Sequence, residues 1–549
     1  MPKTFNTIKL PYPSEGVIRS AQMNDTVAPE QSVQLAVNAT FDRIGAITTR
    51  KGLTTFATAL GGKIISLGKF AQNATTNRQL LAQVATDISR WNGTNWSSIR
   101  TLSSSNKCRY AQFLNLVYTV NGVETGSDAL KTYDGTSYGT TNVALLPKGD
   151  FVSAGFEGRV WVADSTKDRL YYSDIVSVDG IITTTIFVFY TPGSGTFSQG
   201  ETIIGGTSGA TGTVQVVDDI SHYLQVIPTN NTQFTVGETI TGGTSGATGT
   251  VSQSSCAYIE RLSPQDGESI TGLYRVPRAL LVFKQNHIYR VYSSTSIDNY
   301  PAYNVGTFSQ ESIAEAKDGL YFHHSSGFYR FQYDGQPQEI SRRIIDFVNA
   351  IPRTYYESVT AAYDGRDNIT WSIGQVTVDG VTYNNCQCRY TISTQVWTIY
   401  DLSTGFNPSA MIDYDSGNVI AQIVGTTTGG VFQQELGNTD NGTSIYFEVI
   451  TRWISIVDLW SRIKEGSGFA INSENGAGTM IQFQTDKEQP NVWTDIGELD
   501  STYTSLFPNE TTGDFNRLRF RIKGFTNGTP IIFDGIEIMS LIEKGYQNN

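Results

Sequence analysis

Few residues of this chain have the types and spacing that metal binding or proton transfer requires. His323 and His324 are adjacent, so on a strand their side chains point to opposite faces and cannot easily share a metal ion. Cys386 and Cys388 place two sulfurs on one face of an expected strand, but no second Cys or His pair lies at ligand spacing. We therefore expect surface or satisfied imidazoles and buried, inert thiols, with no metal and no cofactor.

The usual phosphate-binding motif is missing from the sequence as well. There is no Gly-X-X-X-X-Gly-Lys loop to cradle phosphates. With 51 acidic residues, any carboxylate pair chosen for glycoside hydrolysis would be arbitrary. The sequence therefore predicts a protein that is not an enzyme and has no catalytic residues.

Composition indicates short strands and tight turns. The 549 residues include 53 Gly, 28 Tyr and 27 Phe, and only 16% are charged. This length exceeds what one compact core usually serves, so several domains or a large repetitive β-architecture are expected. The net charge of -12 argues against a protein whose main task is to hold nucleic acid, although an acidic channel would let DNA pass without binding it.

Cysteine content and hydropathy indicate the cellular compartment in which the chain is assembled. Four cysteines, Cys108, Cys256, Cys386 and Cys388, are too few for a disulfide framework of the secreted type. The first 13 residues have no basic segment followed by an apolar run, and no stretch approaches 18 uninterrupted apolar residues. We expect assembly in a reducing cytoplasm and no stable membrane insertion.

Aromatic strands that run into Asn-Gly or Asp-Gly pairs recur along the chain and predict hairpins with two-residue turns. These pairs are Asn92-Gly93, Asp134-Gly135, Asp334-Gly335 and Asp364-Gly365. Repeated hairpins must stack or close radially to protect their edges, which favours a β-propeller-like body. We assign residues 41–180 and 258–456 to this body, with one helix at Ser341–Ile351 capped by Ser341.

A tandem repeat interrupts the expected body. Residues 197–214 return as 234–251 with three differences, at a spacing of 37 residues. Two near-identical segments predict two equivalent small β-units, so we assign residues 181–257 to an inserted domain of β-repeats. Because this insert is self-contained and poor in charge, we expect it to be a peripheral decoration.

The residue pattern at both ends of the chain differs from that of the expected body. Residues 1–40 are assigned to an N-terminal arm, and residues 457–549 to a C-terminal β-sandwich-like domain with strict alternation over 517–523. The alternating basic residues form the strongest basic feature of the chain: Arg517, Arg519, Arg521 and Lys523. They form a solvated strand face, or they dock on an acidic surface of a neighbouring subunit or on nucleic acid.

One turn invites a comparison with sialidase-like propellers. Residues 363–371 loosely resemble the Asp-box turn of those glycosidases, but the motif occurs once and lacks the spacing. That box shapes a turn and does not carry catalysis, so it names no catalytic residue here.

The passage from Gln34 to Leu53 resembles the opening of tail nozzle or tail hub proteins of short-tailed phages, which are also described as tail tubular protein B-like. The residues that carry the resemblance are Asn38, Arg43, Gly45, Arg50 and Gly52. Lys51 stands where those proteins usually have proline. Residues 170–174, 266–273, 281–284 and 288–290 are similar to successive propeller segments of that family, and the tandem repeat falls between the first two of these.

The resemblance implies a propeller-bearing virion protein, usually six copies in a ring below the portal and adaptor. Such a ring encloses a channel for genome exit and carries docking sites for fibres or spikes. Two other functions stay open: another virion part, such as a head-closure, baseplate or fibre-linked protein, or a propeller that binds or cleaves carbohydrate.

Overall fold

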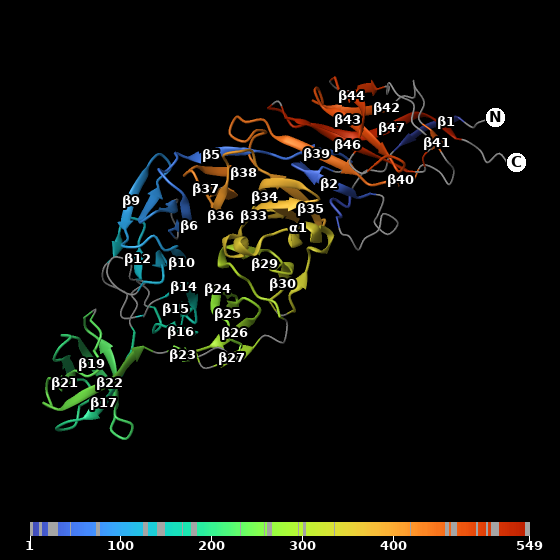
Figure 1. Cartoon of the computed structure of the whole chain (residues 1–549). Coiled ribbons are helices and arrows are strands. Elements are labelled where there is room, and N and C mark those ends of the chain that lie inside the picture. Colours follow the sequence, from blue (N-terminus) through green and yellow to red (C-terminus); the bar gives the residue numbers. More distant parts are fainter. Residues whose placement is uncertain are drawn as a thin grey trace. The chain divides into compact units, whose positions relative to one another are not determined.

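Figure 1 shows the computed structural model, which is built almost entirely of strands with short helical segments. The structure describes residues 4–9, 14–19, 31–43, 45–72, 77–123, 130–139, 146, 149–166, 168–176, 184–230, 232–256, 258–260, 266–294, 296–299, 304–333, 335–417, 419–455, 461–462, 469–489, 492–500, 503–506, 515, 517–526 and 528–543. The chain divides into two compact units, which are described separately: unit 1 (1–59, 311–413 and 419–549) and unit 2 (60–310 and 414–418).

Unit 2 contains four antiparallel sheets of four strands, the form of propeller blades. The first is β6 (Ile64–Ala71), β7 (Arg78–Val84), β8 (Asp87–Trp91) and β9 (Trp96–Thr101), and the second is β10 (Arg109–Phe113), β11 (Leu116–Val120), β12 (Lys131–Tyr133) and β13 (Tyr138–Gly139). The third is β14 (Phe151–Phe156), β15 (Arg159–Asp164), β16 (Arg169–Tyr172) and β23 (Tyr258–Glu260), and the fourth is β24 (Ile270–Val276), β25 (Ala279–Lys284), β26 (Ile288–Ser293) and β27 (Ser296–Asn299).

Neighbouring sheets of unit 2 meet through their first strands: β10 contacts β6 and β14, and β14 contacts β24. Apolar side chains fill the space between sheets because each strand buries one face against the next sheet. Trp161 on β15 and Leu280 on β25, for example, belong to one buried cluster. This succession of sheets is the arrangement of propeller blades.

A closed six-stranded barrel is inserted between β16 and β23, which pair with each other in one sheet. Its strands are β17 (Ile186–Pro192), β18 (Thr202–Gly205), β19 (Thr211–Asp218), β20 (Tyr223–Pro228), β21 (Thr239–Gly242) and β22 (Thr248–Cys256). The barrel has its own apolar core, which includes Val188, Ile203 and Val226. Of the expected inserted domain, residues 181–183, Asn231 and Ala257 lie outside the described residues.

Unit 1 contains further blade-like sets of strands. One sheet is β28 (Ala314–Ala316), β29 (Gly319–His324), β30 (Gly327–Phe331) and β31 (Gln338–Glu339). Another is β36 (Pro408–Asp415), β37 (Ile420–Thr426), β38 (Val431–Gln434) and β5 (Leu53–Ala57). The pairing of β5 with β38 joins a strand near the N-terminus to a sheet made by residues more than 300 positions later.

A ten-stranded sheet in unit 1 runs from a blade into the C-terminal domain. Its blade part is β32 (Thr360–Tyr363), β33 (Asn368–Val378), β34 (Val381–Thr391) and β35 (Val396–Asp401). It continues through β2 (Val33–Val37), β39 (Tyr446–Thr451), β46 (Arg517–Phe525), β43 (Met480–Thr485) and β44 (Thr494–Glu498), with β40 (Ile454–Ser455) on β46. Strand β2 pairs in parallel with β35 and antiparallel with β39, so it bridges the blade and the C-terminal strands.

A seven-stranded sheet packs on this C-terminal part to make a sandwich. It consists of β3 (Ala39–Thr40), β4 (Ile47–Thr49), β47 (Ile532–Glu543), β42 (Phe469–Glu474), β45 (Tyr503–Leu506), β1 (Thr4–Lys9) and β41 (Ser461–Arg462). Aromatic rings join the two sheets: Phe469 lies 5.7 Å from Phe520, and Phe447 lies 5.8 Å from Phe533, between ring centroids. Residues that we expected to form an N-terminal arm therefore supply β1, β2 and β3.

In the part of the chain that the structure describes, the helical segments are short and lie in unit 1 or at its boundary: η2 (Gln310–Ser312), η3 (Arg342–Ile344), α1 (Ile345–Asn349) and η4 (Arg353–Ser358). The predicted helix at Ser341–Ile351 is a 3-10 turn followed by five α-helical residues. Ser341 does not cap it, because its hydroxyl accepts a hydrogen bond from the backbone N–H of Phe328. Among the described residues no helix is long and apolar enough to cross a membrane.

The hairpin turns use a different chemistry from the predicted two-residue turn. Trp91 pairs with Trp96 and Tyr133 with Tyr138, so four residues connect each pair of strands. The Asn92 side chain accepts hydrogen bonds from the backbone N–H groups of Thr94 and Asn95. Of the four residues in this turn, 92–95, only Gly93 has positive φ. Asp334, in the third predicted turn, lies outside the described residues.

The fold class predicted from the sequence is confirmed. The chain is all-β, with a propeller-like body, a small inserted domain of β-repeats and a C-terminal β-sandwich-like domain.

Candidate functional site

Asn38, Arg50 and Asp440, which we call the N-terminal clamp, form a buried polar cluster in unit 1. The Arg50 guanidinium donates to both carboxylate oxygens of Asp440, at 2.8 Å to Oδ1 and 2.7 Å to Oδ2, and both side chains are 0% exposed. Burial alone would raise the pKa of Asp440, but Arg50 and hydrogen bonds from Ser403 lower it below its usual value. Asp440 is therefore a carboxylate paired in two-point geometry.

Asn38 ties the clamp to two strands. It follows β2 with a φ of +54°, a conformation that Asn tolerates better than most residues. Its side-chain NH₂ group donates to the backbone carbonyls of Asp401, 2.8 Å away, and Tyr446, 2.7 Å away. Its side-chain oxygen accepts from Arg50 Nε at 2.7 Å and from the Asp401 N–H at 2.9 Å. One side chain thus joins β2, β35, β39 and Arg50.

The other residues of the family-like signature divide between this cluster and the surface. Gly52 belongs with the clamp, because a Cβ atom there would lie 1.9 Å from the Thr439 carbonyl oxygen. Arg43 and Gly45 lie between β3 and β4. Arg43 makes an exposed ion pair of 3.4 Å with Glu474, and a Cβ on Gly45 would meet open space, although its φ of +84° favours glycine.

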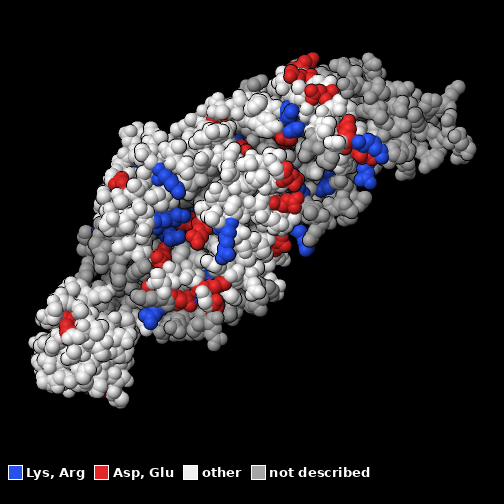
Figure 2. Space-filling model, in the orientation of Figure 1, with Lys and Arg blue, Asp and Glu red and all other residues white. Residues whose placement is uncertain are grey.

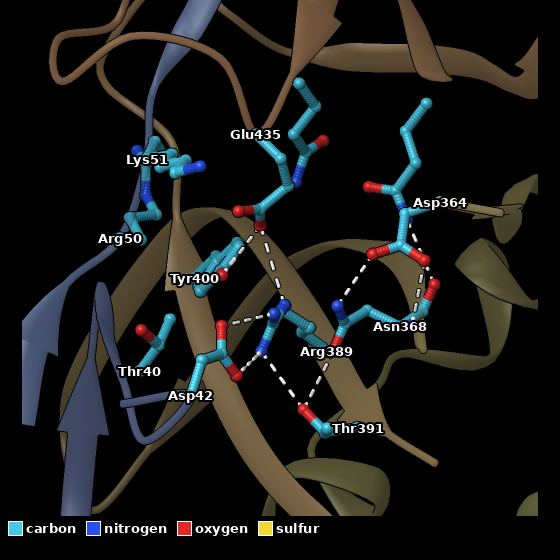
Figure 3. Close-up of polar contacts among 12 residues, drawn as sticks. Thr40, Asp42, Arg50, Lys51, Asp364, Asn368, Arg389, Thr391, Tyr400 and Glu435 are labelled. Carbon is cyan, nitrogen blue, oxygen red and sulfur yellow. Dashed lines mark hydrogen bonds and ion pairs between the residues drawn. The ribbon is translucent and has the colours of Figure 1, made fainter. Parts of the chain in front are cut away.

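A second polar cluster in unit 1 surrounds Arg389 on β34. Figure 3 shows Asp42 and Glu435 approaching the Arg389 guanidinium. Asp42 accepts at 3.1 and 2.7 Å, Glu435 Oε1 lies 3.5 Å from Arg389 Nε, and the Tyr400 hydroxyl donates to Glu435 at 2.8 Å. Burial raises the pKa of Tyr400 well above its usual value, and the nearby Glu435 and Asp42 add to this shift while Arg389 opposes it, so the hydroxyl stays protonated.

A chain of hydrogen bonds leads from Arg389 to the turn that resembles an Asp box. Arg389 donates to Thr391 at 3.1 Å, Thr391 donates to Asn368 at 2.9 Å, and Asn368 donates to Asp364 at 2.6 Å (Figure 3). Asp364 also accepts backbone N–H groups of its own turn, including that of Arg366 at 2.8 Å. Asp364 therefore stabilises a turn, as the aspartate of an Asp box does, and its carboxylate oxygens accept hydrogen bonds within the domain.

Unit 2 has a buried cluster of its own, which we call the Lys284 cluster. Lys284 Nζ is fully buried and lies 2.9 Å from Asp168 Oδ2 and 2.7 Å from Asp266 Oδ2. Tyr289 donates to Asp266 at 2.7 Å. Three segments that resemble propeller segments of the tail proteins, 266–273, 281–284 and 288–290, meet in this cluster.

The predicted basic stripe lies on β46, on the sheet face opposite the sandwich core. Arg519 is buried: its Nε donates to Gln484 at 2.9 Å, and its guanidinium carbon lies 4.5 Å from the ring centre of Trp453 and 5.1 Å from that of Trp493. Arg521 Nε donates to Glu448 at 2.7 Å. The middle of the stripe is thus partly desolvated and engaged within the domain.

The two ends of the stripe, Arg517 and Lys523, are half-buried, and beyond them Phe525 is 58% exposed beside Tyr446. We call this surface the β46 face: Arg517, Arg519, Arg521, Lys523, Phe525, Tyr446, Trp453 and Trp493. Arginine and aromatic side chains are the types enriched in protein–protein interfaces. Arg517 and Lys523 are the more accessible cations of this face.

Two groups of types that can take part in catalysis, His323 and Cys386, are buried. Burial lowers the pKa of His323 to about 3, so this imidazole is neutral, and burial raises the pKa of the Cys386 thiol well above its usual value. All four cysteines are buried, and none of them forms a disulfide. No group of three or more His, Cys, Asp or Glu that could hold a metal ion occurs among the described residues.

Charged side chains of both signs are interspersed on the face drawn in Figure 2. The inserted barrel stands apart in composition, because residues 186–256 contain no Lys or Arg. Sequence reasoning found Asn38, Arg50, Gly52 and the stripe, but it missed Asp440, Arg389, Glu435 and the Lys284 cluster. No sequence motif marks those residues, because their partners are distant in the sequence and come close only in the folded chain.

No family model and no curated protein matches the chain. It is similar to the WD40 domain of Neurospora crassa Pan2, at 7% identity and a TM-score of 0.36 over 70% of this chain and 94% of that chain. It is also similar to the WD40 β-propeller domain of Doa1 (10%, 0.29, 70% and 96%) and to virginiamycin B lyase from Staphylococcus aureus (12%, 0.27, 67% and 98%). At these scores the fold assignment rests on the strand pairing of the chain itself.

Proposed function

We propose that the chain is a non-enzymatic structural subunit of a phage tail. It forms the nozzle or hub ring below the portal and adaptor, provides a conduit for genome ejection, and carries fibres or spikes. The observation that carries the proposal is the N-terminal clamp. Asn38, Arg50 and Gly52, which carry the resemblance to tail nozzle proteins, occupy one buried site that joins a propeller blade to the sandwich.

Charge and architecture are consistent with this proposal. The ten-stranded sheet makes the blade and the sandwich one continuous element, which suits a part that transmits load. The net charge of -12 disfavours DNA binding in a conduit. The homohexamer, the virion location and the portal, adaptor and fibre partners belong to the proposal through the family resemblance.

Within this proposal the β46 face is a subunit interface whose partner is a second copy of the chain. The reason is charge complementarity: the face is basic and aromatic, while the chain as a whole is acidic. A different virion part, or a propeller that binds or cleaves carbohydrate, is the alternative.

The double variant Arg517→Glu/Lys523→Glu is expected to abolish self-association, because it reverses the accessible charges of the β46 face without touching Arg519. The measurement is size-exclusion chromatography with light scattering at low salt. The matched control is Lys63→Glu/Lys69→Glu, which makes the same charge change at two exposed residues in unit 2. Equal assembly of both variants would remove the β46 face from the interface, and a wild-type protein that stays monomeric with its virion partners would contradict the ring.

A further inference from the structure

The repeat in the inserted barrel is longer than the identical letters suggest. A shift of 37 residues carries β17 onto β20, β18 onto β21 and β19 onto β22. The barrel therefore consists of a first half, residues 186–222, and a second half that begins at Tyr223. Each half contributes three strands in the same order.

Strand pairing runs mainly between the halves. Strand β17 pairs with β20 and β22, β20 pairs with β17 and β19, and β18 pairs with β21. Only the hairpin β18–β19, and likewise β21–β22, is internal to one half. The register is symmetric, since Ile186 pairs with Val226 and Phe189 with Tyr223, as a two-fold relation between the halves requires.

Two glutamates make the same reciprocal contact. Glu201 of the first half accepts from the backbone N–H of Ser245 at 2.9 Å and from its hydroxyl at 2.8 Å. Glu238 of the second half accepts from the backbone N–H of Ser208 at 2.8 Å and from its hydroxyl at 2.7 Å. Both glutamates are almost fully buried, at 5% and 4% exposure. Each half thus holds the Gly-Thr-Ser turn of the other.

Glycines at the contact confirm how closely the halves fit. A Cβ on Gly205 would lie 2.7 Å from Glu238 Oε1, and a Cβ on Gly242 would lie 2.6 Å from Glu201 Oε2. Backbone bonds repeat the relation, from Gly206 N–H to the Thr239 carbonyl at 2.9 Å and from Gly243 N–H to the Thr202 carbonyl at 2.8 Å. Glycine at positions 205 and 242 allows the two halves to approach each other closely, because a larger residue would collide with the facing glutamate.

The apolar core is shared in the same way. Equivalent buried residues from both halves form one cluster, including Phe197 and Phe234, Ile203 and Ile240, Ala210 and Ala247, and Val214 and Val251. A half by itself would expose these side chains and the edges of all three strands, which a soluble protein avoids. The surface that covers a half is therefore another half.

We propose that the inserted barrel is a fused dimer, and that each half is a self-complementary binding module whose partner is a second copy of the same half. In the intact chain the short connection between β19 and β20 supplies the partner at high effective concentration, so the barrel closes within one chain. A chain with one half must find its partner on a second chain. This inference does not rest on the proposed tail function.

Two reciprocal deletions test the proposal in the full chain. Removing 220–256 leaves the first half, and removing 186–222 leaves the second half; each cut joins equivalent points of the repeat, so the chain still enters and leaves the barrel at matching positions. The reference protein replaces 186–256 with a short Gly-Ser linker. All three proteins carry Arg517→Glu/Lys523→Glu, so that the β46 face does not add its own association. Light scattering is expected to give the single-half chains twice the molar mass of the reference protein.

Glu201→Ala in the chain that retains the first half is expected to weaken this dimer at least about tenfold, because both serine turns lose their charge-assisted bonds to a buried glutamate. Val216→Ala, at an exposed residue of β19, is the matched control and is expected to leave the dimer unchanged. Two single-half chains with the mass of the folded linker protein at tens of micromolar would overturn the proposal. A dimer that is insensitive to Glu201→Ala would overturn the reciprocal contact.

Discussion

Asp440→Asn is expected to lower the free energy of unfolding of unit 1 by about 3–5 kcal/mol, because it leaves the Arg50 guanidinium buried without its counter-charge. The effect should appear in urea denaturation at pH 7. Hydrogen exchange should localise it to β2, β35 and β39, whose backbone groups the clamp holds. Peptides from unit 2 provide the internal reference.

The double variant Arg50→Met/Asp440→Leu is the matched control for the buried pair. Removing both charges avoids an unpaired ion, so this variant should recover most of the loss. A decrease of less than about 1 kcal/mol for Asp440→Asn would contradict the role of the clamp.

The Asp440 variant also predicts a pH dependence. The pKa of Asp440 is lower in the folded protein than in the unfolded chain, so its stabilising contribution is fully present above the unfolded value of about 3.9. That contribution is lost as the pH falls through the lower, folded value. The difference in stability between wild type and Asp440→Asn should therefore be constant from pH 7 to pH 5 and shrink below about pH 4.

Lys284→Met is expected to destabilise unit 2 by about 3–5 kcal/mol, because it leaves the carboxylates of Asp168 and Asp266 close together without a cation. Hydrogen exchange should increase in β16, β25 and β26. Adding Asp266→Asn to Lys284→Met removes one of the two facing charges and should restore part of the stability. Unchanged exchange in Lys284→Met would show that the cluster does not hold these strands.

The N-terminal clamp and the Lys284 cluster could not be predicted from the sequence, because each brings together residues that lie far apart along the chain. Hairpins were predictable because strand, turn and returning strand are adjacent in sequence, and the alternation of β46 correctly separated its basic and apolar faces. Burial of Arg519 was not predictable, since Trp453 and Trp493 reach it from other segments. That the N-terminal strands join the sandwich was not predictable either, because their partners, such as β39 and β47, lie more than 400 residues away in the sequence.

The inserted domain shows the same limit at shorter range. Identity between 197–214 and 234–251 indicated two equivalent units, and this was visible in the letters. The equivalence of β17 and β20 was hidden because apolar strands need only a pattern, not identical residues. The pairing of strands between the two halves could not be predicted either. A repeat has the same sequence whether its strands pair within one repeat or with the neighbouring repeat.

Electron microscopy of the purified protein, alone and mixed with the portal and adaptor of its phage, tests the proposed tail function most directly. The proposal predicts closed rings with a central channel that extend the axis of the portal. Single particles of monomer size that do not bind the portal or the adaptor would contradict it.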